Sequence, residues 1–211
     1  ALDRLRNFVA NVTEVQDGES VAYAAYVLAR NGRPVAGDLR YLADTKLAEL
    51  KTPLARAQLA AALGLIGDRS RAATVFESAV QLLRNGRDGA TGRSDYGTRL
   101  RDGAALITLA AETGVGPDAV APAARVVSEE RQSRISTSTQ ENAWMVLAAQ
   151  AMAKDAEGMT LTVDGTPRKG ALYRTIRADA LEAKPLAIAN PGSANAQAVI
   201  TVAGIPTAPE P

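Results

Sequence analysis

Two kinds of predicted helix alternate along the first 155 residues of the chain. One kind is apolar on nearly every face, and its segments are 21–29, 59–63, 104–111 and 143–149. The other kind has one apolar stripe and a charged back, and its segments lie around 39–47, 75–83 and 120–127. Because a helix that is apolar all round must be covered all round, the alternation predicts an inner layer of helices inside an outer layer. We therefore expect a mainly α fold, either a partial α/α toroid of antiparallel helix pairs or an α-solenoid.

Start and stop signals place eight helices in this region. They are expected at about residues 1–11, 21–29, 39–50, 53–66, 69–84, 98–112, 117–131 and 139–154. Thr52-Pro53 supplies a capping hydroxyl and a proline at the first helical position, and Asp38 and Asp68 are interpreted as caps of the helices that follow them. The run Ser138-Thr139-Gln140-Glu141 matches a capping box, in which serine and glutamate each satisfy a backbone N–H of the other.

A short β segment is predicted after Gly158, where the apolar period changes to two. Strands are expected at 159–163, 171–176, 186–189 and 198–202, with a hairpin turn at Asp164-Gly165. Four short strands are too few to close a β-sandwich comfortably. We therefore expect a domain that continues past Pro211. The predicted division is a helical toroid domain at 1–157, incomplete, a β segment at 158–205 and a connector at 206–211, and both ends read as cut from a longer polypeptide.

The chain contains neither cysteine nor histidine. Disulfides, cysteine nucleophiles, Ser-His-Asp catalysis and His-ligated zinc are therefore excluded within it. The 24 basic and 23 acidic residues nearly balance, which gives no support for a nucleic-acid partner. No apolar run is long enough for a membrane helix. We expect no enzymatic activity, no metal and no cofactor.

The candidate site residues lie at two polar helix starts. Tyr96, Arg101 and Asp102 stand where the apolar helix 98–112 begins, and they could face a substrate. Charged residues at such a position more often satisfy one another or the unmet backbone groups of the first turn. We therefore assign these three residues a structural role.

The second polar start is that of the helix 139–154, with Ser138, Gln140 and Glu141. Its hydroxyl groups could bind an anion at the helix N-terminus. A glutamate at the third helical position suits a cap and weakens anion binding, so these residues are also assigned a structural role.

Two other charged groups are interpreted as solvated surface. Glu129 and Glu130 point about 100° apart on a helix, so they do not converge on one substrate. The loop before residue 98 carries mixed charges, namely Arg84, Arg87, Asp88, Arg93 and Asp95.

Two sequence strings resemble a known family. They are Tyr96-Gly97-Thr98-x-Leu100-Arg101-Asp102-x-Ala104 and Thr137-Ser138-Thr139-Gln140-Glu141-Asn142-Ala143-Trp144, and both are similar to segments late in the thioester domain of bacterial alpha-2-macroglobulins. The resemblance implies an α/α toroid within a very large periplasmic protein, which in full length is expected to be anchored as an inner-membrane lipoprotein. That protein traps proteases: a bait region is cut, the molecule rearranges, and a Cys–Gln thioester bonds to the attacker.

This chain has no cysteine and cannot carry the thioester, so either the motif lies upstream or the protein belongs to the thioester-less class. The resemblance implies a non-catalytic scaffold segment that shapes and shields the thioester region. The implied partners are the trapped proteases and other domains of the same polypeptide. Eight helices fall short of the six helix pairs of a full toroid, so exposed apolar faces should make the isolated chain self-associate or fold with marginal stability.

Two alternatives stay open. One is a protein- or peptide-binding α-solenoid with no protease-trapping role. The other is an enzyme on an α/α toroid, such as a glycosidase or a terpene cyclase, which would need converging carboxylates or an Asp-rich motif that the sequence does not contain.

Overall fold

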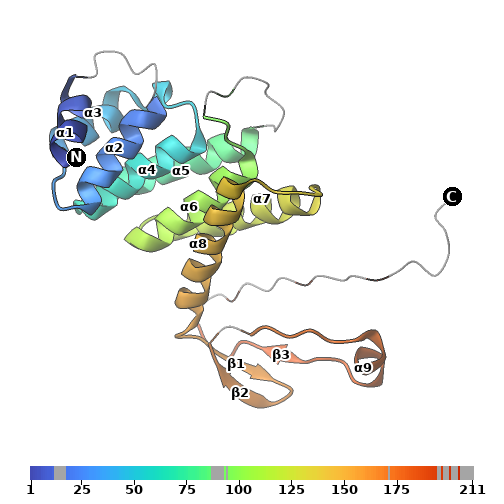
Figure 1. Ribbon diagram of the computed structural model, residues 1–211. Coiled ribbons are helices and arrows are strands. Elements are labelled where there is room, and N and C mark those ends of the chain that lie inside the picture. Colours follow the sequence, from blue (N-terminus) through green and yellow to red (C-terminus); the bar gives the residue numbers. More distant parts are fainter. Residues whose placement is uncertain are drawn as a thin grey trace. The chain divides into compact units, whose positions relative to one another are not determined.

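The chain divides into two compact units, Ala1–Met152 and Ala153–Pro211. The computed structural model describes residues 1–11, 18–86, 93, 95–170, 172–193, 196, 200 and 204 (Figure 1). The first unit is helical and the second carries a small antiparallel sheet. The prediction of a mainly α fold followed by a β segment is confirmed. Within the described residues, no helix is long and apolar enough to cross a membrane.

All eight predicted helices are present, and the last of them runs past the end of the first unit. They are α1 (Leu2–Asn11), α2 (Gly18–Arg30), α3 (Ala36–Thr45), α4 (Pro53–Leu65), α5 (Arg69–Asn85), α6 (Arg99–Thr113), α7 (Val120–Gln132) and α8 (Thr139–Ala156). The predicted third helix is divided into α3 and a short 3-10 turn, Leu47–Glu49. The predicted seventh helix likewise begins with a 3-10 turn, Pro117–Ala119.

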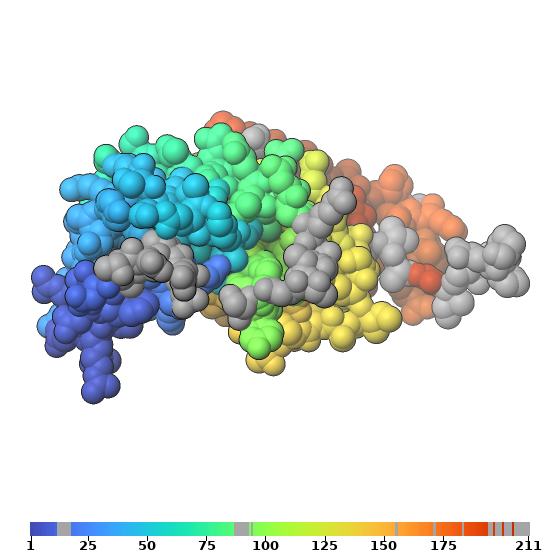
Figure 2. All heavy atoms as spheres, turned by 90° about the horizontal axis from the view of Figure 1, so that it is seen from above, coloured from blue at the N-terminus to red at the C-terminus, as the bar shows by residue number. Residues whose placement is uncertain are grey.

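Three of the four predicted inner helices, α2, α4 and α6, are each more than half buried, as the alternation predicts. The central helix α4 packs against α2, α5 and α6, while α1 packs against α2 and α7 against α6. Nine of the thirteen residues of α4 and ten of the fifteen residues of α6 are buried. In contrast, α5 buries one stripe only, which consists of Ala72, Val75, Phe76, Ala79, Val80 and Leu83. In the space-filling view of Figure 2, the atoms of the helical unit, coloured from blue to yellow, form one continuous surface.

The last apolar helix, α8, departs from the prediction that it would be covered on every face. Only Glu141 and Ala148 are buried among its described side chains. Val146 is 57% exposed and Leu147 is 44% exposed. The contacts of α8 with the hydrophobic core come from one face, so the described neighbours cover only that side.

The predicted caps have different outcomes. Thr52 caps α4, because its Oγ1 accepts a hydrogen bond of 3.2 Å from the backbone N–H of Ala55. The assignment of Asp38 as a cap is wrong, since α3 already begins at Ala36 and Asp38 lies in its first turn. Asp68 stands at the N-cap of α5, but its carboxylate makes no capping bond. It pairs instead with Arg40 at 3.1 Å and Arg71 at 3.2 Å.

The second unit contains a three-stranded antiparallel sheet in the order β2-β1-β3. Its strands are β1 (Thr160–Val163), β2 (Thr166–Lys169) and β3 (Ile188–Ala189), and a short helix, α9 (Ala178–Ala183), precedes β3. Asp164 and Gly165 have φ values of 50° and 81°, as in the tight turns that join β-hairpins.

The predicted return strand at 171–176 is wrong. The two-residue turn leads directly into β2, so Val163 pairs with Thr166 and Thr160 pairs with Lys169. Helix α9 was not predicted, because its six residues are too few to show a helical period. Most of the predicted strand 198–202 lies outside the described residues.

The exposed face of α8 leads to a prediction about association. We expect the 211-residue chain to associate at high concentration, and Val146→Gln with Leu147→Gln to reduce this association because burial of these side chains would drive it. Light scattering across a concentration series would measure the change. Ile135→Gln is the matched control, since Ile135 is fully exposed outside any helix. A wild-type monomer at every concentration would contradict the prediction.

Candidate functional site at the starts of two helices

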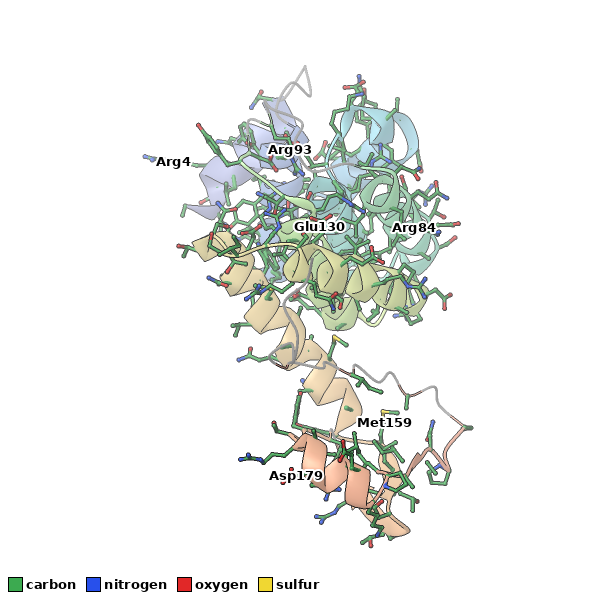
Figure 3. The ribbon with its side chains drawn as sticks, turned by 90° about the vertical axis from the view of Figure 1, so that its right-hand side faces the viewer. Arg4, Arg84, Arg93, Glu130, Met159 and Asp179 are labelled. Carbon is green, nitrogen blue, oxygen red and sulfur yellow. The ribbon has the colours of Figure 1, made fainter. Side chains whose placement is uncertain are left out.

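The fold brings together the two polar helix starts that the sequence singles out. Thr98, the N-cap of α6, donates from Oγ1 to Glu141 Oε1 in the first turn of α8 at 2.7 Å. Arg101 of α6 donates from Nη1 to Gln140 Oε1 at 3.2 Å. The two starts are separated by about forty residues in sequence, and these two contacts join them in space. In Figure 3, Arg93 and Glu130 of this region are labelled within the first unit, whereas Arg4 and Arg84 extend from its edges.

Two arginines and two aspartates form the centre of the cluster. Asp102 is fully buried, and its Oδ1 accepts hydrogen bonds from Arg101 Nε at 3.0 Å and Nη2 at 2.7 Å. Arg93 binds both oxygens of Asp95, with Nε–Oδ1 at 3.0 Å and Nη2–Oδ2 at 2.8 Å. Two further ion pairs connect these two pairs: Arg101 Nη2 lies 2.5 Å from Asp95 Oδ2, and Arg93 Nη2 lies 2.9 Å from Asp102 Oδ2. This last contact is an ion pair without hydrogen-bond geometry.

Gly97 is required by this arrangement. A Cβ atom at this position would lie 2.1 Å from Arg101 Nη2 and 2.5 Å from Arg93 Nη2. The guanidinium groups therefore rest where a side chain would otherwise be. The backbone N–H of Gly97 also donates to Asp95 Oδ1 at 3.0 Å.

Glu141 forms a reciprocal cap with Ser138 at the start of α8. Its Oε2 accepts from the backbone N–H of Ser138 at 2.6 Å, and its own backbone N–H donates to Ser138 Oγ at 3.2 Å. Arg134 Nη1 lies 3.2 Å from Glu141 Oε1. A negative carboxylate therefore already occupies this helix N-terminus, which leaves no favourable position for a bound anion.

Burial and ion pairing act on the carboxyl groups in opposite directions. Burial raises the pKa of Asp102, and the nearby Arg101 and Arg93 offset only part of this effect. Burial would also raise the pKa of Asp95, but hydrogen bonds from Arg93 and Arg101 hold that pKa well below its usual range. The pKa of Glu141 is likewise lowered, because its bonds from Ser138 and Thr98 outweigh its burial.

The carboxylates of the cluster are engaged by neighbouring groups. A raised pKa can mark a general acid, but Asp102 has no exposed surface from which to reach a substrate. Glu130 is engaged by Arg99 at 2.7 Å and Arg134 at 3.3 Å. Within the described residues, no group of three acidic, histidine or cysteine side chains could hold a metal ion.

Tyr96 stands apart from the other candidate residues. Its side chain is 91% exposed and its backbone has a φ of 50°, in the left-handed region that few non-glycine residues adopt. A backbone hydrogen bond from its N–H to the carbonyl of Arg93 at 3.1 Å holds the turn. The structure thus places five of the six candidates in one hydrogen-bonded cluster and Tyr96 at its exterior.

Sequence reasoning missed several members of the cluster. Arg93 and Asp95 were interpreted as solvated surface, and this interpretation is wrong because they pair with Arg101 and Asp102. Glu130 was also interpreted as solvated surface, and this is wrong because its side chain is 12% exposed and pairs with Arg99 and Arg134. Thr98 and Arg134 were not recognised. The sequence did contain a signal: Arg93 and Asp95 form a pair of one positive and one negative residue a few positions before the similar pair Arg101 and Asp102. The predicted loop residues Arg87 and Asp88 lie outside the described residues.

Fold and cluster together define a class: a domain of layered helix pairs in which buried charges tie the starts of two helices. An alpha-2-macroglobulin from Xylella fastidiosa is 31% identical to the chain over 154 residues, which are 72% of this chain and 9% of that protein. The chain is a homologue of the bacterial alpha-2-macroglobulins. No family model matches it.

Solved structures agree with this assignment. Salmonella alpha-2-macroglobulin reacted with methylamine matches 91% of this chain and 13% of its own, with a TM-score of 0.63 and 29% identity. Escherichia coli alpha-2-macroglobulin activated by porcine elastase matches 90% of this chain and 18% of its own, with a TM-score of 0.63 and 25% identity. The chain thus spans only a small part of the length of the proteins that it matches.

The buried ion pairs give a prediction for mutants. Arg101→Met and Asp102→Leu should each lower the free energy of unfolding by about 3 kcal/mol, because each removes one partner of a buried charge. The double variant should be more stable than either single variant, since Arg93 and Asp95 still pair with each other. Urea unfolding of the four proteins would measure the coupling. Additive losses in the double variant would contradict the prediction.

The lowered pKa values give a prediction for acid stability. Because Asp95 and Glu141 have lower pKa values in the folded state, they contribute stability above about pH 4, and it is lost as the pH falls through their folded-state values. Asp102 acts in the opposite sense, since its pKa is raised. Asp95→Asn should flatten the decline in the free energy of unfolding between about pH 5 and about pH 3. If unfolding free energy plotted against pH runs parallel in the variant and the wild type, the lowered folded-state pKa is refuted.

Proposed function

We propose that the chain is a non-catalytic scaffold segment of a bacterial alpha-2-macroglobulin-like protease trap. In this role it shapes and shields the region around a thioester. The main support is that both sequence strings that resemble this family lie in the cluster joining α6 and α8, within a fold similar to the solved macroglobulins.

The absence of an enzymatic role is part of the proposal. The carboxylates at the two helix starts are occupied by arginine, hydroxyl or backbone donors, so none of them is available as a free catalytic base. The chain has no cysteine, so any Cys–Gln thioester would come from a different part of the longer polypeptide. A member of the family without a thioester is equally compatible with this chain.

The proposed partners follow from the relatives. One solved relative is described as activated by porcine elastase, which supports proteases as the targets of the complete protein. Other domains of the same polypeptide are proposed to cover apolar surface such as the exposed face of α8. We further propose that the helical unit is the incomplete toroid of a thioester-type domain, that the β segment begins the next domain, and that the protein resides in the periplasm.

A peptide-binding α-solenoid is the alternative. The exposed side chains Val146 and Leu147 on α8 could contact an apolar peptide. In the proposal favoured here, the same face contacts another domain of the polypeptide. The two functions differ in whether the 211-residue chain binds peptides by itself.

The complete gene product provides the test. We expect the longer protein to retain elastase or trypsin on a sizing column and to reduce its cleavage of a large protein substrate. The 211-residue chain should neither inhibit these proteases nor bind a library of apolar peptides. Within the longer protein, Arg101→Met should lower the yield of functional trap, because it disrupts the buried cluster.

Gly37→Ala is the matched control for this experiment. A Cβ atom at position 37 would meet no atom within 4 Å, so the substitution should leave trapping unchanged. Peptide binding by the 211-residue chain, without protease retention by the longer protein, would refute the proposal and favour the α-solenoid.

A further inference from the structure

Helix α8 is attached to the helical unit in a different way from the other apolar helices. Two of its eighteen residues, Glu141 and Ala148, have buried side chains in the described part of the chain. By comparison, ten of the fifteen residues of α6 are buried. Most of the surface of α8 therefore contributes little to its attachment.

The polar attachments of α8 are concentrated in its first turn. Gln140 and Glu141 contact α6 and the α7–α8 connection, and Asn142 accepts a hydrogen bond from Thr137 of that connection at 2.7 Å. Glu141 is the most buried of these three α8 residues, with 3% of its surface exposed. Its carboxylate accepts a hydrogen bond from Thr98, the N-cap of α6, and pairs with Arg134 of the connection. This one group therefore joins α8 to both α6 and the α7–α8 connection.

The apolar attachments of α8 form a narrow strip. Trp144, Met145 and Met152 are half-buried against the core cluster, and Ala148 is buried between them. Ala148 contributes a small contact area and the two methionines are flexible, so Trp144 is the only large and rigid side chain among these four. The opposite face exposes Val146 and Leu147.

The division between the two compact units falls inside α8. The first unit ends at Met152 and the second begins at Ala153, whereas α8 runs without interruption from Thr139 to Ala156. Residues that follow Ala153 are therefore joined covalently, through one continuous helix, to the first turn that Glu141 holds.

We propose that α8 is a separable strap that Glu141 holds against helices α1–α7. The strap detaches as one unit, while α1–α7 stay folded. Glu141 is a positioning residue in this device, because it fixes the start of α8 against Thr98 and Arg134. Detachment exposes the strip from Trp144 to Met152. Local opening of this kind occurs where an element has few buried contacts, and it has a lower free energy than global unfolding.

Trp144 is a built-in probe, because it is the chain's single tryptophan and it lies on the strip. The whole 211-residue chain would be titrated with urea, at a concentration where light scattering reports a monomer. Emission from Trp144 should shift to the red at a lower urea concentration than that at which far-UV circular dichroism is lost. Coincident transitions would overturn the proposal, since α8 would then belong to the same cooperative unit as the other helices.

Three variants distinguish the attachment of α8 by Glu141 from helix capping and from a general loss of stability. Glu141→Gln should raise the equilibrium constant for the Trp144 transition by at least about tenfold and leave the circular dichroism transition in place. Ser138→Ala removes the capping hydroxyl but keeps the bonds of Glu141 to Thr98 and Arg134, so its effect should be smaller. Glu112→Gln, at the far end of α6, breaks a comparable pair with Tyr26 and Arg30 and should not change the first transition.

Hydrogen exchange provides a second readout on the same variants. In Glu141→Gln, amides of residues 143–152 should exchange at least about tenfold faster, with no change in α2, α4 and α6. Equal acceleration in all helices would overturn the proposal, because Glu141 would then support the whole fold. An effect of Ser138→Ala equal to that of Glu141→Gln would also overturn it, because capping alone would then explain the result.

Discussion

The close packing of small side chains around α4 is the constraint on which the rest of the structure depends. The residues of α4 that face α2, α5 and α6 are largely alanine, so the helices can approach closely. Glycine has the same effect elsewhere: a Cβ atom at Gly103 of α6 would lie 2.9 Å from a methyl group of Val127 in α7. Packing of this kind tolerates little movement, because interiors have few voids. The helix ends are therefore fixed in position, and the charges at those ends can be placed accurately.

The buried charges depend on that rigid frame. A buried ion pair rarely adds much stability, because desolvation of the charges offsets their attraction. What the pairs around Arg101 and Asp102 provide is geometric selectivity: few other positions of Arg93 and Asp95 against the start of α6 would satisfy two arginines and two aspartates together. The same reasoning explains why both family-like sequence strings lie here, since each contributes half of one contact region.

Much of the fold could be predicted from sequence, because the relevant signals are local. The apolar period defined the helices, and Thr52-Pro53 and Ser138 to Glu141 marked two starts correctly, since a cap is a contact between near neighbours. Asp38 misled because several residues near a helix start can serve as its cap. Exposure of α8 could not be predicted, because an apolar sequence reports what a helix can bury and does not specify which neighbours are present. The partners of Arg93 and Asp95 were likewise beyond reach, since they depend on how a loop folds back onto a helix.

The sheet of the second unit has two edges with different properties. Strand β2 forms one edge, and its sequence Thr166-Pro167-Arg168-Lys169 is fully exposed. Proline has no N–H to offer a neighbouring strand, and the adjacent positive charges repel a second copy of the same edge. The β2 edge of this sheet is therefore a poor site for the addition of a further strand.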